Sequence, residues 1–408
     1  MTGIDFNPSS RVFAQDPYAV YGQLRQLDEP FWYPDMEILL LSRYEVVDRV
    51  ARDPHMVRGV DSFMSEEAQL AGQRARNWHD MPNHERFIQF SMLEIDGEDH
   101  RRLRGLVLRE FSKTLIEKQR EMIQDHVDHL LDSLLEQGDI DFVNDFAVKV
   151  PGYVIGQVLG VPAEDAVQLR TWSEEIVQFF DVGRTESDKA VAEAAVTAFY
   201  EYLLPQIRDR QKQPRDDLLT VLVQAHADGQ LSETELVSTT MLILAGGHGS
   251  TIDVLGNGMN ALFSFPDEMQ RLRRSPDLVQ TAVHEMFRYD SPLPFFHRFA
   301  DREVEVMGCA YPIGTKFGLL YGSANRDPDY YPDADRFDIG RTPNRHLGFG
   351  RGAHLCLGNN LARLDMEIIF TTLFRRTRAI ERIIDEPLYR TGLSARGLEA
   401  LQVRLVPA

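Results

Sequence analysis

Residues 346–367 read HLGFGRGAHLCLGNNLARLDME, and this stretch decides how the rest of the chain is interpreted. Glycines alternate with small and apolar residues up to Cys356, and a helical pattern begins directly after it. So many glycines let the backbone take positive φ angles and approach a flat ligand. A cysteine before a helix is favoured as a thiolate by the free N–H groups and the dipole of that helix. The pattern suits a nucleophile or an anionic metal ligand, and a buried structural cysteine is the third alternative.

The segment FGRGAHLCLG, residues 349–358, matches the FGxGxHxCxG signature of the cytochromes P-450, a family that this chain resembles. The resemblance implies that Cys356 is the axial ligand of a heme iron and that Phe349 packs against the sulfur side. It also implies that His354 reaches a heme propionate and that Gly350 helps the loop to lie along the porphyrin. A thiolate ligand favours O–O cleavage, the chemistry of this family. The implied cofactor is heme b, iron protoporphyrin IX.

A second motif lies in TAVHEMFRYDSP, residues 281–292, where Glu285 and Arg288 are three residues apart on a predicted helix. On a surface such a pair contributes little to stability. In the family, an ExxR pair at this distance before the cysteine is buried and joined by a later arginine. Arg336, in YYPDADRFDIGR, matches that third member. The resemblance therefore implies a structural triad of these three residues.

Further basic residues resemble the family's propionate contacts. The segment DGEDHRRLRGLVLREF, residues 96–111, carries His100 and Arg104 with the spacing HxxxR. Arg298, ten residues after Arg288, matches another such contact, and the alternative for each is a solvated charge. The cluster of Arg101, Arg102, Arg104 and Arg109 is unusual in an acidic chain. We expect it to dock an acidic redox partner, a ferredoxin that is served by a ferredoxin reductase.

The central segment begins with a capping box, Ser232 with Glu235, and runs to about residue 265. It predicts one helix of about 30 residues, long enough to cross the core. However, Gly246, Gly247 and Gly249 fall within four residues, and each costs about 0.5–1 kcal/mol in a helix interior. The segment is therefore locally unwound, or something approaches its backbone closely. Tight helix packing and room for dioxygen over a heme are the two explanations of a close approach.

In the family, this helix carries an acid followed by threonine, and the pair delivers protons to dioxygen. Alignment puts Gly249 at the acid position and Ser250 at the threonine position, with Thr251 next. Ser250 can still donate a hydrogen bond, but Gly249 cannot relay a proton. Water acting with Ser250, His248, or a polar group of the substrate could replace the acid, although His248 points about 200° away from Ser250 on a helix. A different chemistry that needs no dioxygen is the fourth possibility.

The resemblance also implies a substrate pocket whose lining is mainly apolar, with aromatic rings from two segments. The implied positions are Ile88, Phe90, Leu242, Ala245, Gly246, Leu293 to Phe296 (with Phe295), Ser394 and Ala395, and more weakly Phe179 and Phe180. Each could equally belong to the core. Such a lining fits a small or medium hydrophobic or aromatic substrate.

Composition narrows the classes of protein. The chain has 408 residues, and its formal charge of -19 argues against nucleic-acid or anionic-lipid partners, because an acidic surface repels phosphate. No apolar run approaches the roughly 20 residues that span a bilayer, and the start MTGIDFNPSSRVFAQ has no signal-peptide pattern. Two cysteines, Cys309 and Cys356, exclude a disulfide framework. We expect a cytoplasmic protein with no membrane partner.

The predicted fold is mainly α with a small β portion, the cytochrome P-450 fold with its long central helix over the heme. No linker interrupts the chain, so residues 1–408 are expected to form a single domain. Residues 16–27 predict a first amphipathic helix and residues 31–42 a hairpin, whereas strands are expected after Asp290 and at the C-terminal end.

The predicted function is that of a heme-thiolate monooxygenase that hydroxylates or epoxidises a hydrophobic substrate with dioxygen and electrons from a ferredoxin. Gly249 keeps open a peroxygenase, a nitric oxide reductase or an oxidative coupling enzyme on the same fold. A heme-bound sensor or ligand carrier is the non-catalytic alternative.

Overall fold

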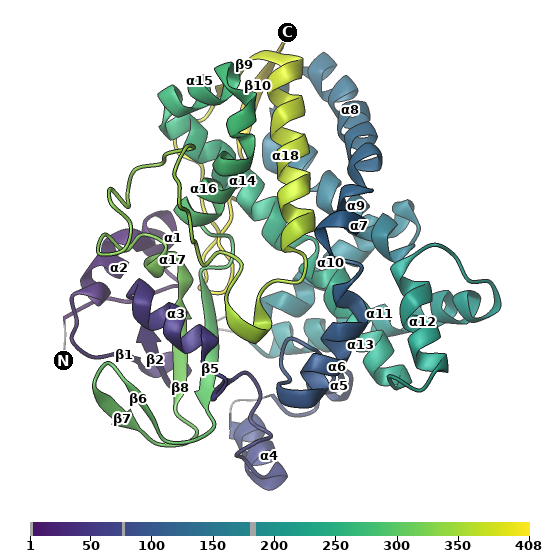
Figure 1. Ribbon diagram of the computed structural model, residues 1–408, viewed down its shortest axis with the longest axis vertical. Coiled ribbons are helices and arrows are strands. Elements are labelled where there is room, and N and C mark those ends of the chain that lie inside the picture. The colour runs from purple at the N-terminus through teal and green to yellow at the C-terminus, as the bar shows by residue number, and fades with distance from the viewer. Residues whose placement is uncertain (1–2, 76–77, 180–184) are drawn as a thin grey trace.

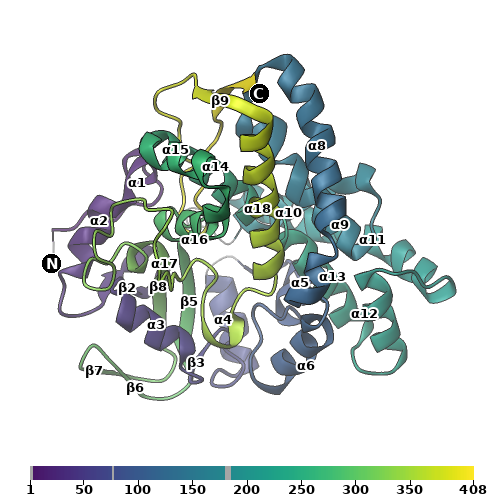
Figure 2. The same ribbon diagram turned by 45° about the horizontal axis from the view of Figure 1, so that its top comes forward.

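The computed structural model describes residues 3–75, 78–179 and 185–408. In Figure 1 the main sheet and the first helices lie to the left, the last two strands lie at the top, and the helices between residues 82 and 246 fill the right side. The turned view of Figure 2 keeps α14 and α16 beside α18, which runs along the middle of the molecule. The α-helices are α1 (Arg11–Gln15), α2 (Pro17–Arg25), α3 (Tyr44–Arg52), α4 (Glu66–Ala75), α5 (Pro82–Gln89), α6 (Gly97–Leu108), α7 (Lys113–Glu117), α8 (Arg120–Gln137), α9 (Lys149–Leu159), α10 (Ala166–Gln178), α11 (Glu186–Lys212), α12 (Leu218–Ala227), α13 (Glu233–Gly246), α14 (Gly249–Ser264), α15 (Pro266–Arg274), α16 (Val279–Tyr289), α17 (Tyr321–Ala324) and α18 (Asn359–Arg376).

The strands form one main sheet and two small ones. They are β1 (Phe31–Tyr33), β2 (Ile38–Leu41), β3 (Met56–Val57), β4 (Asp139–Asp141), β5 (Phe295–Ala300), β6 (Val304–Val306), β7 (Cys309–Tyr311), β8 (Lys316–Leu320), β9 (Thr377–Arg382) and β10 (Gln402–Pro407). The main sheet has the order β1-β2-β8-β5-β3, and the others are β4-β10-β9 and β6-β7. β1 and β2 pair antiparallel with Phe31 opposite Leu40, which confirms the predicted hairpin. The mainly helical class with a small β portion is also confirmed.

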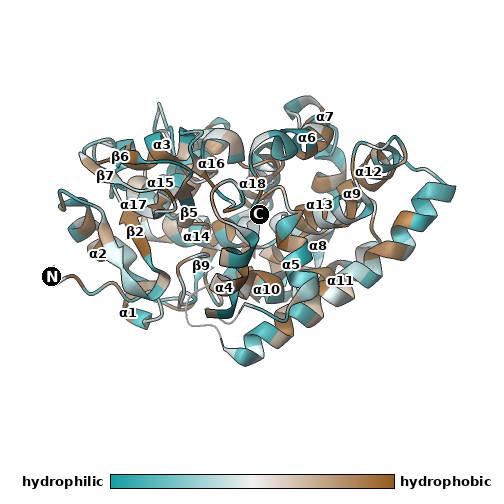
Figure 3. Ribbon diagram, turned by 90° about the horizontal axis from the view of Figure 1, so that it is seen from below, coloured by the Kyte–Doolittle hydropathy of each residue, from teal (hydrophilic) through white to brown (hydrophobic). Residues whose placement is uncertain are grey.

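The largest hydrophobic core lies among the helices, and two smaller clusters pack against the main sheet. α18 packs against α8 and α16, and α14 packs against α16. α11 lies along the outside, where hydrophilic and hydrophobic bands alternate along its length (Figure 3). Within the described residues, no helix combines the length and the apolar character that crossing a bilayer requires.

The central helix is interrupted, so the prediction of one continuous helix was wrong. Both halves of the capping box are present at Ser232, but α13 ends at Gly246 and α14 begins at Gly249. A Cβ at Gly247 would collide with Ile155 of α9, which explains this glycine by tight packing. In contrast, nothing lies within 4 Å of a Cβ built at Gly246 or Gly249. Unwinding, tight packing and open space therefore all occur, each at a different glycine.

The predicted ion-pair triad has a different third member. Glu285 and Arg288 are fully buried on α16, with a bidentate pair of 2.8 Å bonds. The arginine that joins them is Arg341, whose Nε lies 3.2 Å from Oε1 of Glu285. The side chain of Arg336 is 62% exposed, and only its backbone carbonyl accepts a hydrogen bond from Arg288. Arg336 was therefore the wrong choice, because the turn after it carries Arg341 back toward α16.

Candidate functional site

Cys356 lies between a short 3-10 turn, Gly352–His354, and the start of α18. The loop folds back on itself, since the N–H of Cys356 donates to the carbonyl of Phe349 at 2.9 Å. Gly350 and Gly352 take φ angles of 67° and 72°, which side chains rarely adopt. A Cβ at Gly352 would also collide with the carbonyl of Ala51 on α3. The glycines thus bring the loop against its neighbours and hold the half-buried Cys356 just before the start of α18.

The surroundings of the sulfur have opposing effects on its charge. Burial raises the pKa of the Cys356 thiol, whereas backbone N–H groups of Gly358 and Asn359, with Arg104 and Arg363, lower that pKa. Among the described residues, no histidine or carboxylate is hydrogen-bonded to the sulfur. A cysteine nucleophile needs such a base, whereas a metal ligand needs only stabilisation of the thiolate. The arrangement favours a ligand.

Phe349 packs inside this loop. Its ring centroid lies 4.2 Å from that of Phe287. The guanidinium of Arg363 lies 5.9 Å from the ring centroid of Phe349. Because its carbonyl also accepts the Cys356 N–H, Phe349 fixes the backbone on which the sulfur sits.

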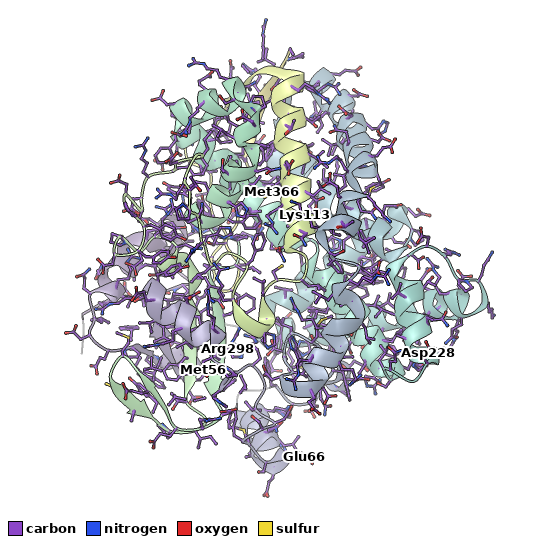
Figure 4. The ribbon with its side chains drawn as sticks, viewed as in Figure 1. Met56, Glu66, Lys113, Asp228, Arg298 and Met366 are labelled. Atoms are coloured by element: carbon purple, nitrogen blue, oxygen red, sulfur yellow. The ribbon has the colours of Figure 1, made fainter. Side chains whose placement is uncertain are left out.

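A group of buried donors adjoins the same loop. The ring of His100 lies 4.4 Å from that of His354, and Nε2 of His100 is buried without a hydrogen-bond partner. Arg298, on β5, is 3% exposed and donates to the carbonyl of His297 at 2.8 Å. No carboxylate of the described residues forms an ion pair with Arg298. Figure 4 shows Arg298 close to the loop before α18, and its charge acts on His354.

Unpaired buried donors are costly unless a ligand satisfies them. A heme carries carboxylates at its rim and iron at its centre, so the residues present fit this group: Cys356 for the metal and Arg298 with His100 for a propionate. His354 is partly engaged already, because its Nε2 lies 2.9 Å from Asp96. Arg104 donates to the carbonyl of Leu355 beside the sulfur.

Two residues of this site were missed from the sequence. Asp96 accepts from His354 and from the backbone N–H groups of Arg58 and Gly59. Arg58 is 4% exposed and pairs with Glu94. Asp96 is the first residue of the segment that carries His100, and Arg58 lies well before it, but the sequence offers no signal that distinguishes either from a solvated charge.

The break between α13 and α14 brings the hydroxyl-bearing residues Ser250 and Thr251 next to the open space beside Gly249. Ser250 is half-buried, whereas Thr251 is 5% exposed. His248 is buried against Gly152 of α9, and its Nδ1 is bonded to the carbonyl of Leu244. Burial lowers the pKa of His248. His248 therefore packs between helices, and Ser250 is the more accessible alcohol beside Gly249.

The structure places the implied pocket positions in different surroundings. Phe295 packs in the N-terminal core against Gly318, on the face of β5 opposite to Phe296, so its assignment to the pocket was wrong. Ile88 and Leu242 pack partly against the main core. The positions that are half-buried and outside these clusters are Phe90, Ala245, Leu293, Ser394 and Ala395. Phe179 is 1% exposed and stacks on Trp78, and Phe180 lies outside the described residues.

Known proteins resemble this chain in sequence and in fold. The sequence model of the family described as Cytochrome P-450 matches residues 63–381. The polyketide biosynthesis cytochrome P-450 PksS of Bacillus subtilis is 32% identical, over 99% of this chain and 100% of that protein. The vitamin D(3) 25-hydroxylase of Pseudonocardia autotrophica is 34% identical, over 98% and 96%. The crystal structure of P-450BioI with an acyl carrier protein ligated to hexadec-9Z-enoic acid superposes with a TM-score of 0.89 at 30% identity, over 97% and 100% of the two chains.

Proposed function

The chain belongs to the cytochrome P-450 family, and from this premise we propose that it is a heme b monooxygenase of a small-to-medium hydrophobic or aromatic substrate. A heme cofactor and the oxidoreductase class follow from the family. We further propose that residues 1–408 act as one cytoplasmic domain, that a ferredoxin with its reductase supplies the electrons, and that the product is hydroxylated or epoxidised.

One observation supports the heme assignment above the others. Cys356 and His354 are two residues apart on one loop. His354 adjoins His100, whose Nε2 is buried without a hydrogen-bond partner, and Arg298, which has no ion-pair partner among the described residues. A single ligand with a metal at its centre and carboxylates at its rim would satisfy both sets. When bound, a thiolate-ligated heme supplies the activation of dioxygen.

The remaining roles belong to the chain's own side chains. We assign the thiolate ligand to Cys356, the backbone of the loop to Phe349 and Gly350, and propionate binding to His100, Arg298, His354 and Arg104. Ser250 would donate a proton toward the open space beside Gly249. Apolar side chains such as Phe90 and Leu293 would hold the substrate and exclude water.

Only some of the arginines that were predicted to dock the redox partner are exposed in the structure. Arg102 is paired with Asp99 and Glu235, and Arg104 turns inward to Leu355. Arg101, which lies 3.9 Å from Glu98, and Arg109 are both exposed, and Leu108 beside Arg109 in the chain is 52% exposed. Exposed arginines next to an exposed apolar side chain suit an acidic electron carrier.

Charge reversal tests this face. Arg109→Glu should slow reduction by the ferredoxin about tenfold without changing the spin shift that the substrate induces. Arg74→Glu, an exposed arginine on α4, is the matched control and should leave reduction unchanged. Equal reduction rates in Arg109→Glu and the original protein would exclude this docking face.

The function itself is tested by spin-state titration of the purified ferric protein. The panel should contain small aromatic compounds, free fatty acids and the same acyl chains attached to an acyl carrier protein, since a structural neighbour is described with that partner. A shift to high spin identifies the compound class that displaces iron-bound water. A shift with the carrier-bound acyl chain alone would contradict a free small-molecule substrate.

The second step compares oxidants. Product formed with ferredoxin, reductase and dioxygen supports the monooxygenase. Product formed with peroxide alone would favour the peroxygenase, and Gly249 is the observation that keeps this second function open. Consumption of nitric oxide would identify a nitric oxide reductase, and coupling of two substrate radicals without oxygen insertion would identify an oxidative coupling enzyme.

A further inference from the structure

Polar side chains form a stripe along α14, although most other residues of this helix are buried and apolar. The stripe consists of Ser250, Asp253, Asn257 and Asn260, spaced three, four and three residues apart, which places them on one helical face. Three of them contact the C-terminal segment 389–397. Asp253 pairs with Arg390, the amide of Asn257 donates to the carbonyl of Arg396 at 2.9 Å, and that of Asn260 to the hydroxyl of Tyr389 at 3.3 Å. The stripe therefore runs from Ser250 along the side of α14 that contacts segment 389–397.

Asp253 is the acid of the stripe. It is 4% exposed, and its Oδ1 lies 2.6 Å from Nη2 of Arg390, whose side chain is 43% exposed. A Cβ at Gly397 would collide with the Asp253 carboxylate, so this glycine lets the segment close over the acid. Burial raises the pKa of Asp253, while Arg390 lowers it. The acid is thus shielded from water, with one charged neighbour between it and the solvent.

The other candidates near Ser250 are less suitable. Gly249 has no side chain, and His248 packs on the opposite side against α9. Arg170 and Glu174 of α10 act on Asp253 electrostatically but form an ion pair with each other at 2.7 Å. Asp253 is one helical turn from Ser250 and on its face, so their side chains are neighbours.

We propose that Asp253 replaces the acid that is missing at position 249, and that it supplies protons to the open space through the hydroxyl of Ser250. In each transfer, the carboxylic acid gives a proton to the Ser250 oxygen as Ser250 gives its own proton to the pocket. The resulting carboxylate then takes up a proton from solvent. Only O–H bonds form and break here, and the electrons come from the redox partner.

Asn257, one helical turn beyond Asp253, supports a water-filled path along this face of α14. Oδ1 of Asn257 is buried and has no hydrogen-bond partner among the described residues. A buried acceptor of this kind is usually satisfied by water. A water there would adjoin Asp253, since three to four residues separate neighbours on one helical face.

The simpler explanation is that Asp253 only anchors the C-terminal segment through Arg390. Asp253→Asn and Arg390→Gln distinguish the two, because each removes the same ion pair but only the first removes the acid. If the pair were just an anchor, both variants would lose equal thermal stability and equal coupling of electrons to product.

The experiment uses the heme-loaded protein with the ferredoxin, its reductase and the substrate found by titration. We expect Asp253→Asn to lower product per electron pair about tenfold or more, to release the difference as hydrogen peroxide, and to raise the solvent deuterium isotope effect. Its spin-state titration and its unfolding midpoint should match those of Arg390→Gln, which should keep product per electron pair within about twofold of the original protein.

A rescue variant completes the test. Gly249→Asp has open space for its side chain, so combining it with Asp253→Asn should restore the coupling. Coupling that survives in Asp253→Asn, or that falls equally in both ion-pair variants, would overturn the proposal. The inference rests on the proposed dioxygen chemistry. An original protein that forms product from peroxide alone would refute that function first, before any variant is compared.

Discussion

Arg341 and Glu285, which are 56 residues apart in the chain, are joined by a 3.2 Å contact between the arginine Nε and the carboxylate Oε1. The same carboxylate accepts from Arg288, from the N–H of Asp338 and from the amide of Asn344. The guanidinium of Arg288 in turn donates to the carbonyls of Asn325 and Ala334 at 2.8 Å. This network ties α16 to the irregular segment that leads into the cysteine loop, so the position of the sulfur depends on it.

Removal of Arg341 should therefore be costly. Arg341→Ala removes one of the two positive charges that compensate the fully buried carboxylate of Glu285. We therefore expect a loss of about 3 kcal/mol in the free energy of unfolding. Arg336→Ala, the control, should change it by less than about 0.5 kcal/mol. Denaturant unfolding measures both, and the reverse order would restore Arg336 as the third member.

The ligand assignment predicts a spectroscopic change. Cys356→His should retain some heme but lose the thiolate-type absorption of the ferrous carbon monoxide complex. Cys309→Ser, at the other cysteine, should keep that absorption. A thiolate-type spectrum in Cys356→His would exclude Cys356 as the ligand.

The unpaired guanidinium of Arg298 predicts opposite effects with and without heme. Arg298→Met removes a buried charge, so the heme-free protein should become more stable in thermal unfolding. The heme-loaded variant should lose heme about tenfold faster to an acceptor protein, because a propionate is left without its partner. Arg302→Met, whose arginine is 57% exposed, should change neither. Unchanged heme loss would remove Arg298 from the propionate site.

Buried histidines predict sensitivity to acid. Burial lowers the pKa of His354 to about 4, and burial likewise lowers the pKa values of His346 and His297. Because these rings stay neutral when folded but bind protons when unfolded, their contribution is present above about pH 6.5 and is lost as the pH falls. The midpoint temperature of thermal unfolding should therefore be lower at about pH 5 than at about pH 7.

One ring tests that prediction directly. His346 donates to Nδ1 of His284 at 3.0 Å and accepts from the N–H of Gly348 at 3.2 Å. His346→Gln should flatten the decline of stability with acid by up to about 1.4 kcal/mol per pH unit. His129→Gln, at an exposed position, should leave the slope unchanged, and equal slopes in the two variants would contradict the assignment.

A buried acid predicts the opposite slope. Burial raises the pKa of Asp365 on α18, and its Oδ1 has no partner among the described residues. Its ionisation therefore favours the unfolded chain, so the penalty grows as the pH rises above the unfolded pKa. Asp365→Asn should stabilise the protein at neutral pH by about 1 kcal/mol or more, whereas the exposed Asp385→Asn should not. A less stable Asp365→Asn would mean that the carboxylate has a partner.

Patterns within short stretches of the sequence were sufficient to predict many features of this structure. The capping box at Ser232, the hairpin around β1 and β2 and the cysteine before α18 depend on residues close together in the chain. Their physics is local, because caps, turns and helix ends are decided by neighbouring backbone groups. The sequence by itself thus determined the fold class and the motif that carries the candidate ligand.

Tertiary structure decided which side chains meet across the chain. Arg336 and Arg341 lie five residues apart in one irregular segment, and only packing against α16 selects Arg341. Phe295 and Phe296 are consecutive, so alternation in β5 sends their rings to opposite faces. Asp253 became a candidate acid only when segment 389–397 folded over it and excluded water. Burial and the charges that it brings together are long-range properties, and a one-dimensional pattern does not contain them.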